Sequence, residues 1–452
     1  MEYVIAVILL LSFIGCIIYI LKGSNLMITM LVMATLWTIL ALIGKFACGA
    51  EFQALNTTVS EMSVGDILTN VYQAGPVGWG IVLVNVMFGA FFGRVLLDTG
   101  IVSTLIRKTV ELGGDKPVVT NLLLCLVSAA CFTTMTGPGA VISIGVIVLP
   151  ILLSLGVKKP VAVWSYVASV AAGFLLNPVI FTQYVAYFKN AAGFDEYTYQ
   201  VNLPWAIAAS VTMLVVIIVY SSILIAKDNK VKKVAAWAAP VAEPENKVPG
   251  IALLCPIIPI ILVIAFKCNV ILAMIGTSVL ALLLCGKGKT FGDLSRNISK
   301  AFADGVIDSA PIMGFFLTVP MFCNAAALCA PYFNVLLAPI VPKNAVVIAI
   351  ALAILAPLGM NRGPLTLMGA GVVTVGILNS IGMPTMLMFP LLTATTIVMN
   401  CATDLTQSWN SWAVGYVKCD TKDFLKLTIP VGWIMTALLM VVTLILRGGV
   451  SF

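Results

Sequence analysis

The chain has 452 residues, of which 61% are hydrophobic and only 10% are charged, and its formal net charge is +7. Soluble domains carry roughly 25% charged residues, so this composition excludes a soluble globular protein. The small basic excess indicates membrane topology rather than nucleic-acid binding. There is no histidine, and the 11 cysteines form no Cys-x-x-Cys pair. This argues against zinc, haem and Cys/His catalysis, so we expect no cofactor.

Apolar segments of about 20 residues, the length that crosses a bilayer, recur along the whole chain. The predicted spanning helices cover 4–21, 26–47, 78–97, 161–180, 204–226, 250–266, 269–286, 305–326, 385–404 and 427–446. Two further apolar stretches, 117–156 and 344–381, are too long for one crossing and are interrupted at mid-length by Gly-Pro. We predict that each is a re-entrant hairpin. The alternative is a pair of ordinary spanning helices around a buried turn.

The two halves of the chain share these interruptions at a constant offset. Gly137-Pro138 and Leu155-Gly156 return as Gly363-Pro364 and Ile381-Gly382 (363 − 137 = 226; 381 − 155 = 226). Such duplicated, interrupted segments mark the binding sites of transporters built from inverted repeats. Placing the basic loops in the cytoplasm gives an odd number of crossings in each half, with the N-terminus outside.

The sequence therefore predicts an all-α polytopic membrane protein with two inverted repeats. Each repeat contains five transmembrane helices and one re-entrant hairpin. The predicted boundaries are 1–226 for the first repeat, 227–249 for a cytoplasmic linker and 250–452 for the second repeat.

The turn of the first predicted hairpin combines hydroxyl groups with glycines. The following helix, which begins near Ala140, directs its N-terminal N–H groups and positive dipole end at this turn. Hydroxyl and backbone N–H groups there can bind an anion, and threonine oxygens can bind a cation. The candidate substrate-binding residues are Thr134, Thr136, Gly137 and Gly139, and Thr133 is a candidate cation ligand.

The turn of the second predicted hairpin carries a charge within an apolar region. Arg362 and Asp404 are the only charged residues between Lys343 and Lys418. Charged groups within a bilayer are costly and mark functional sites, and a guanidinium can bind a carboxylate through two hydrogen bonds. Asn361, Arg362 and Gly363 are therefore candidate substrate-binding residues, with a helix starting after Pro364. The alternative is a structural ion pair between Arg362 and Asp404.

The helices that follow the two hairpins are predicted to be broken. The first contains Asn177-Pro178, and at the same offset the second contains Thr403-Asp404, preceded by Asn400. Asn177, Asn400 and Thr403 are candidate substrate ligands. Asp404, with Asn400, is the candidate site for Na⁺ or a proton. For Asn177, a hydrogen bond that packs two helices is the alternative.

Two other charged residues in apolar segments receive less weight. Asp308 is expected at the membrane interface, and Arg94 is expected to extend its guanidinium to the cytoplasmic surface. We expect the two hairpin turns and the two broken helices to converge in the middle of the membrane.

A family resemblance supports these assignments. The segment Phe88–Gly100 reads G-x-x-x-G-x-x-L-x-x-T-G from Gly89, and it precedes a basic stretch that ends at Leu112-Gly113. This pattern resembles the gluconate permease and citrate symporter families of the ion transporter superfamily, clearly over about residues 80–180. The resemblance implies dimeric elevator-type carriers of carboxylates, and the gluconate branch suggests proton symport. The Thr136-Gly137-Pro138-Gly139 turn differs from the Ser-Asn-Thr turns of the sodium–dicarboxylate branch.

Together these features predict a secondary transporter in the bacterial inner membrane. It would import a small organic anion, a carboxylate or hydroxy acid, by H⁺- or Na⁺-coupled symport across the lipid bilayer, without changing the anion chemically. The resemblance implies that it works as a homodimer. A Na⁺/H⁺ antiporter that uses Asp404 and the threonines is the alternative. Absence of a channel filter motif, of histidine and of a G-x-S-x-G motif argues against a channel or an enzyme.

Overall fold

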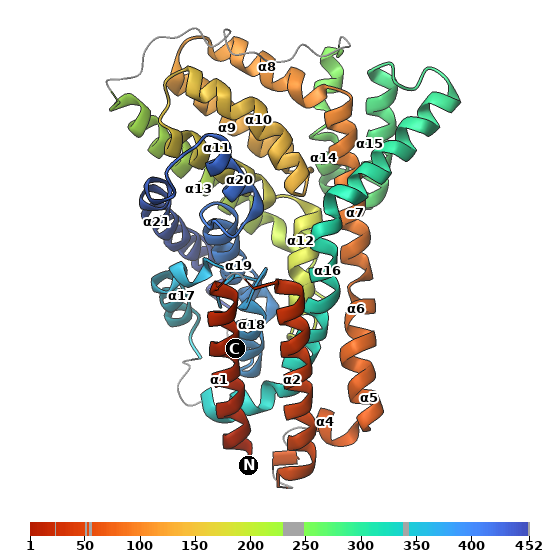
Figure 1. Cartoon of the computed structure of the whole chain (residues 1–452), viewed down its shortest axis with the longest axis vertical. Coiled ribbons are helices and arrows are strands. Elements are labelled where there is room, and N and C mark those ends of the chain that lie inside the picture. The colour runs from red at the N-terminus through yellow and green to blue at the C-terminus, as the bar shows by residue number, and fades with distance from the viewer. Residues whose placement is uncertain (23, 50–51, 54–56, 229–247, 338–342, 451–452) are drawn as a thin grey trace.

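The computed structural model describes residues 1–22, 24–49, 52–53, 57–228, 248–337 and 343–450 (Figure 1). Within these ranges every regular element is a helix. The predicted linker 227–249 lies almost entirely outside the described residues.

The helices of the first half begin with a long antiparallel pair and end with a long helix. Their bounds are α1 (Glu2–Leu21), α2 (Leu26–Ala47), α4 (Thr57–Glu61), α5 (Val64–Thr69), η1 (Asn70–Ala74), α6 (Gly75–Gly78), α7 (Gly80–Asp98), α8 (Ile101–Gly113), α9 (Pro117–Phe132), α10 (Pro138–Ser154), α11 (Lys159–Phe174), α12 (Pro178–Val185), η2 (Ala186–Phe188) and α13 (Tyr199–Ala226).

The second half contains the longest helix of the described chain. Its elements are η4 (Gly250–Leu254), α14 (Ile258–Phe266), α15 (Val270–Leu284), α16 (Phe291–Leu337), α17 (Ala345–Ile354), η5 (Ala356–Gly359), α18 (Gly371–Ser380), α19 (Thr385–Thr395), η6 (Thr396–Cys401), α20 (Ser408–Tyr416) and α21 (Thr421–Arg447).

Six helical segments of the described chain are long and apolar enough to cross a membrane: Glu2–Ile20, Leu26–Ala47, Val64–Asp98, Tyr199–Ala226, Ile312–Phe333 and Thr421–Arg447. A seventh is the broken pair Lys159–Phe174 and Pro178–Phe188, bent by 74°. The bend follows from Pro178, which cannot donate a helical hydrogen bond. Ten full-length spans are therefore not present in these ranges.

The predicted spans differ from the observed helices mainly in the second half of the chain. The prediction of one span over 250–266 is wrong, because Pro256 separates a short 3₁₀ turn from α14, which has only 9 residues. The predicted span 269–286 is α15, with 15 residues. The predicted span 385–404 is a 17-residue helix, Thr385–Cys401, which ends before Asp404.

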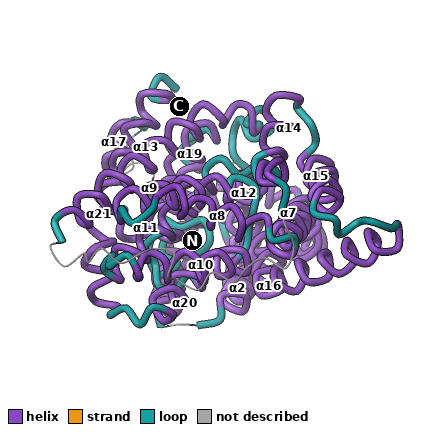
Figure 2. Tube along the Cα trace, turned by 90° about the horizontal axis from the view of Figure 1, so that it is seen from above, coloured by secondary structure: helices purple, strands orange, loops and turns teal. Residues whose placement is uncertain are grey.

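Helix α16 is the central element of one side of the molecule. It runs antiparallel to α7, because Asp308 lies beside Arg94 while Asn324 donates a hydrogen bond to Asn70. It runs parallel to α2, because Met27 lies against Gly314 and Gly44 lies against Tyr332. We call α2, α7, α15 and α16 the scaffold group; Figure 2 shows α7, α15 and α16 together on one side.

The other side contains the two hairpins and the helices packed with them. Helices α11, α13, α19 and α21 contact one another, and with α9–α10 and α17–α18 they form what we call the hairpin group. In Figure 1 the α9–α10 hairpin lies in the upper half and α17–α18 in the lower half. The two hairpins therefore approach the middle of the molecule from opposite ends.

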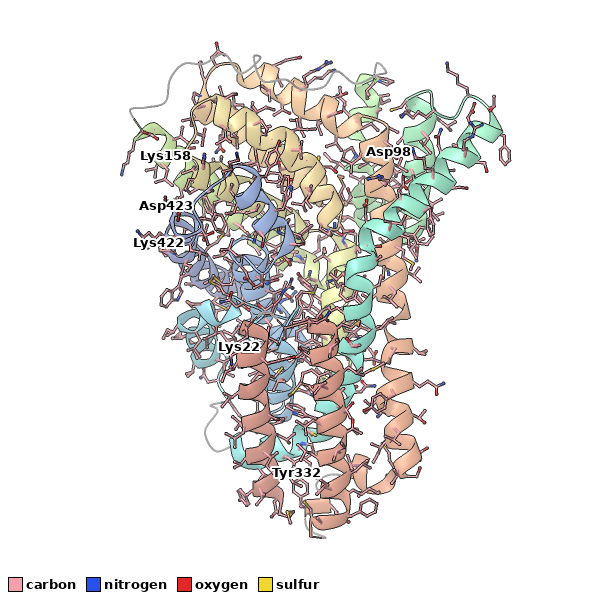
Figure 3. The ribbon with its side chains drawn as sticks, viewed as in Figure 1. Lys22, Asp98, Lys158, Tyr332, Lys422 and Asp423 are labelled. Atoms are coloured by element: carbon pink, nitrogen blue, oxygen red, sulfur yellow. The ribbon has the colours of Figure 1, made fainter. Side chains whose placement is uncertain are left out.

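Loops that were predicted on the same side of the membrane lie together. The ammonium group of Lys159 donates a hydrogen bond to the carbonyl oxygen of Lys418 at 3.0 Å. Figure 3 shows Lys158, Lys422 and Asp423 in the same upper region and Tyr332 at the opposite, lower end. At the other end of the hairpin group, Asn379 donates a hydrogen bond to the carbonyl oxygen of Asn190 at 3.0 Å.

The second hairpin is not a copy of the first. Helix α10 begins at Pro138, two residues before the predicted start near Ala140. The prediction that the corresponding helix of the second hairpin starts after Pro364 is wrong, because α18 begins at Gly371. The intervening chain folds back on itself, and the N–H group of Ala370 donates a hydrogen bond to the carbonyl oxygen of Arg362 at 2.9 Å. This fold-back occupies the residues that would form the first turns of a helix.

Candidate functional site

A cavity of about 290 Å³ lies between the scaffold group and the hairpin group. Both hairpin turns, both broken helices and the scaffold helices α7 and α16 contribute to its wall. Aromatic residues, among them Phe174, Tyr184 and Trp409, form much of the apolar lining. The polar and charged side chains that line it are Arg94, Thr136, Gln183, Asp308, Ser309, Arg362, Gln407 and Ser408.

The turn of the first hairpin reaches the cavity through residues 136–140. Gly137 has φ +88°, a conformation that residues with a side chain rarely adopt, so this turn requires glycine. The hydroxyl of Thr136 is buried and has no hydrogen-bond partner in the described structure. Because an unpaired buried hydroxyl costs free energy, Thr136 is a good candidate to bind a ligand. Gly137 and Gly139 line the cavity beside it.

Thr133 and Thr134 belong to the same turn but do not line the cavity. The hydroxyl of Thr134 donates a hydrogen bond to the carbonyl oxygen of Pro256 at 2.6 Å, which fastens the turn to the second half of the chain. The hydroxyl of Thr133 donates to the carbonyl oxygen of Ala130 at 2.7 Å. Both hydroxyls are thus engaged with the backbone.

Asn177 is completely buried and joins the first hairpin to the broken helix α11–α12. Its amide nitrogen donates to the carbonyl oxygens of Phe132 and Met135, each at 3.0 Å. Its amide oxygen accepts from the N–H groups of Val179 at 2.9 Å and Ile180 at 3.3 Å, which caps α12. These contacts match the packing alternative for Asn177, and the residue does not line the cavity.

The turn of the second hairpin holds two adjacent residues in the left-handed region. Asn361 has φ +53° and Arg362 has φ +58°, which is uncommon for residues other than glycine. A Cβ atom on Gly363 would overlap the carbonyl oxygen of Leu358. The backbone is therefore closely packed here, and Arg362 is the residue of this turn that lines the cavity.

The guanidinium of Arg362 is held by two acceptors. It donates to the side-chain oxygen of Gln407 at 2.5 Å and to the carbonyl oxygen of Met368 at 3.2 Å. Both of these residues also line the cavity. The charge of Arg362 is therefore fixed at the cavity wall without an anionic partner among the described residues.

Asp404 lies behind this wall and is completely buried. Its carboxylate accepts hydrogen bonds from the side chains of Asn400 at 2.8 Å and Thr406 at 2.6 Å. It also accepts from the backbone N–H of Thr406 at 2.8 Å and, at 3.4 Å, from that of Arg362. The predicted alternative, an ion pair between Asp404 and the guanidinium of Arg362, does not occur among the described residues.

The surroundings of Asp404 offer a further oxygen. The amide oxygen of Asn400 is buried and has no hydrogen-bond partner in the described structure. By contrast, the hydroxyl of Thr403 donates to the carbonyl oxygen of Val398 at 3.1 Å and does not face the cavity. The described residues contain no group of 3 or more His, Cys, Asp or Glu side chains that could hold a metal ion.

The scaffold side of the cavity contains a cluster of charged residues around Arg94 and Asp308, which received less weight than the hairpin residues in the predictions from sequence. Arg94 lies 3.4 Å from the carboxylate of Asp308, 3.7 Å from that of Asp304 and 3.6 Å from that of Asp98. Arg94 and Asp308 both line the cavity. The four-residue spacing of Asp304 and Asp308 on one helix face was the signal available in the sequence.

No protein-family model and no curated protein matches this sequence. Among solved structures, the YdaH transporter from Alcanivorax borkumensis, described as having an unusual topology, aligns with a TM-score of 0.60 and 14% identity. The alignment covers 94% of this chain and 99% of that one. The chain has the fold of a known transporter. The similarity does not single out the gluconate permease or citrate symporter families, and it shows the fold alone.

Proposed function

We propose that the chain is a secondary transporter that imports a small organic anion, a carboxylate or hydroxy acid, by H⁺- or Na⁺-coupled symport. The observation that carries this proposal is the guanidinium of Arg362 at a cavity between two hairpin turns. Of the two lining arginines, Arg94 is paired with Asp98, Asp304 and Asp308, whereas the guanidinium of Arg362 forms no ion pair among the described residues. The unpaired guanidinium favours an anion over a cation beside it.

The substrate's carboxylate binds between the two hairpin turns. Arg362 supplies a bidentate donor, Thr136 supplies its unpaired hydroxyl, and the first turn of α10 supplies backbone N–H groups without intrahelical partners. Phe174 and Trp409 pack against the carbon skeleton. A cavity of about 290 Å³ is at the small end of the range for ligand pockets. It therefore suits a small acid.

Coupling to a cation is assigned to Asp404. Its carboxylate accepts a hydrogen bond from the backbone of Arg362, so its charge state acts directly on the turn that carries the substrate-binding guanidinium. Neutralisation by H⁺, or by Na⁺ bound with the free oxygen of Asn400, precedes movement of the hairpin group against the scaffold group. By resemblance, the protein works as a homodimer in the bacterial inner membrane.

A Na⁺/H⁺ antiporter is the second candidate. The observation in its favour is the unpaired oxygen of Asn400 next to the carboxylate of Asp404, since hard cations prefer such oxygen ligands. Arg362 would then have only a structural role, through its hydrogen bonds to Gln407 and Met368.

A melting-temperature screen of the purified protein tests the proposal. A panel of organic anions is added with and without Na⁺ and at two pH values, because a ligand that binds only the folded state raises the melting temperature. We expect a shift with at least one carboxylate, lost in Arg362→Ala. Arg107→Ala is the matched control: Arg107 pairs with Glu111 on α8, outside the cavity, and its loss leaves the shift intact.

Two results would contradict the proposal. Shifts with Na⁺ or Li⁺ alone, indifferent to every anion, would establish the antiporter reading. An anion shift that survives in Arg362→Ala would remove Arg362 from the substrate site.

A further inference from the structure

Asp308 reaches from the scaffold group to the first turn of α10 in the hairpin group. A Cβ atom on Gly139 would lie 3.0 Å from both Cγ and Oδ2 of Asp308. Gly139 is the second residue of α10, so the carboxylate lies against the N-terminal end of that helix. The absence of a side chain at Gly139 is what leaves room for this contact.

The same helix end has the properties of an anion-binding site. The first N–H groups of a helix lack intrahelical acceptors, and the helix dipole is positive there. Independently, Thr136 is only 5% exposed, its hydroxyl has no partner in the described structure, and it lines the same cavity. A negatively charged group of the protein therefore lies beside a site prepared for a negatively charged ligand.

Asp308 is not locked in this position by its cationic neighbour. Its distance to the guanidinium of Arg94 is 3.4 Å, longer than the 2.7–2.9 Å of a strong charge-assisted hydrogen bond. Arg94 is shared with Asp98 at 3.6 Å and Asp304 at 3.7 Å, so none of the three carboxylates forms a close pair with it. Figure 3 shows Asp98 in the upper region, where α7 ends beside α16. A small movement of Asp308 toward Arg94 would shorten that ion pair.

We propose that Asp308 is a built-in competitor for the substrate's carboxylate, an inference that rests on the function proposed above. In the empty cavity Asp308 occupies the positive end of α10 and connects the scaffold group to the hairpin group. The substrate anion displaces it, and Asp308 then moves closer to Arg94 and shortens their existing ion pair. The contact lowers the affinity for substrate and restrains the empty carrier more than the loaded one.

The test compares substrate affinity in two matched variants. The probe is whichever of acetate, lactate, gluconate and succinate gives the largest melting-temperature shift on the unaltered protein. Asp308→Asn is expected to bind it about three- to tenfold more tightly, because a like charge leaves the helix end. Asp293→Asn is the control, since Asp293 lies at the start of the same helix, pairs with Arg296 and does not line the cavity. We expect its affinity to change by less than about twofold.

A second pair of variants tests the role of Arg94. Arg94→Gln removes the alternative partner of Asp308 and is expected to weaken binding. The double variant Arg94→Gln/Asp308→Asn is expected to recover the affinity of Asp308→Asn. If Arg94 instead contacts the substrate directly, the double variant remains weak, which overturns the proposal. Asp308→Ser repeats the charge removal should Asp308→Asn fold poorly.

Transport in proteoliposomes supplies a readout that a purely structural role would not change. Substrate exchange requires only movement of the loaded carrier, whereas net uptake also requires return of the empty one. Net uptake should therefore be slower than exchange in the unaltered protein, and the two rates should approach each other in Asp308→Asn. An unchanged ratio would contradict the proposal.

The outcomes separate this inference from the proposed function. If no anion shifts the melting temperature of the unaltered protein, the proposed function fails and the inference fails with it. If anion binding is lost in Arg362→Ala but is equal in the unaltered protein and Asp308→Asn, only the inference fails. Equal tightening of substrate binding in Asp308→Asn and Asp293→Asn would show a general effect of charge and would also overturn the inference.

Discussion

At the scale of single residues, Asn177 uses both ends of its amide to join two elements. Removing that amide would leave two buried carbonyl oxygens and two helix-end N–H groups without partners. Asn177→Ala is expected to lower the free energy of unfolding by about 3 kcal/mol, because such unsatisfied groups carry their full desolvation cost.

The measurement is the melting temperature in detergent, with Asn269→Ala as the control. Asn269 also caps a helix, α15, but it is exposed and makes no contact with a hairpin turn in the described structure. The melting temperature should fall clearly further in Asn177→Ala than in Asn269→Ala. Equal falls would mean that Asn177 acts only as a helix cap.

Asp404 gives a prediction about coupling at the same scale. Asp404→Asn keeps the shape of the side chain but removes its charge, so a cation no longer changes its state. We expect this variant to bind the anion but to lose gradient-driven accumulation in proteoliposomes, while exchange continues. Asp423→Asn, at the exposed start of α21, is the control and should accumulate anion normally. Accumulation by Asp404→Asn would place coupling elsewhere.

The sequence located some of these residues better than others. Arg362 could be found because a charge in a long apolar segment is rare and costly. The orientation of Thr134 could not be found, because its hydroxyl binds the carbonyl oxygen of Pro256, 122 residues away. For the same reason the pairing of Arg94 with Asp308, 214 residues apart, was visible only in the structure.

At the scale of elements, the second hairpin turn depends on close backbone packing. A methyl group on Gly363 would overlap the carbonyl oxygen of Leu358, whereas one on Gly376 in α18 would meet no atom within 4 Å. Gly363→Ala should therefore displace the turn that carries Arg362, and both the melting temperature and the anion-induced shift should fall. Gly376→Ala should retain both, with a small gain in stability because alanine favours helix.

Anion binding by Gly363→Ala that equals that of Gly376→Ala would show that the turn tolerates displacement. In that case the position of Arg362 would not depend on the packing of its own turn.

Local sequence signals predicted these elements unevenly. Helix α10 was predicted to begin near Ala140 and begins at Pro138, in a Gly-Pro dipeptide, since proline suits the first turn of a helix. The same dipeptide at Gly363-Pro364 did not start a helix, because Asn361 and Arg362 turn the backbone so that Ala370 bonds back to Arg362. That fold-back depends on contacts across the turn, which composition and periodicity do not report.

At the scale of the whole molecule, the two hairpins open toward opposite ends (Figure 1). Membrane-impermeant thiol labelling of single cysteines, introduced after replacing the 11 native ones, tests this arrangement. Cysteines at Asp115 and Lys158, which flank the first hairpin, should be labelled from the cytoplasmic side. A cysteine at Asn344, which caps the first helix of the second hairpin, should be labelled from outside. Labelling of all three from one side would contradict opposed hairpins.

The offset between the two halves of the chain predicted which distant segments correspond to each other. Helix α19 begins at Thr385 and α11 at Lys159, which reproduces the offset found in the sequence (385 − 159 = 226). The offset did not predict the length of α16, whose 47 residues extend beyond the predicted span 305–326. The added residues at its start are largely polar, so hydropathy alone starts the helix too late.

The position of the charge cluster on α16 has an electrical consequence. Asp308 lies four residues, about 6 Å along the helix, before Ile312, where the apolar span of α16 begins. Arg94 lies four residues before Asp98, the last residue of the span Val64–Asp98. Moving one elementary charge through a membrane potential of 100 mV involves about 2.3 kcal/mol. Asp98, beside this cluster, lies in the same upper region as Lys158, whose loop is predicted to be cytoplasmic. An imported anion therefore crosses most of that potential before it reaches this position, and voltage acts mainly on the steps that bring the loaded site there.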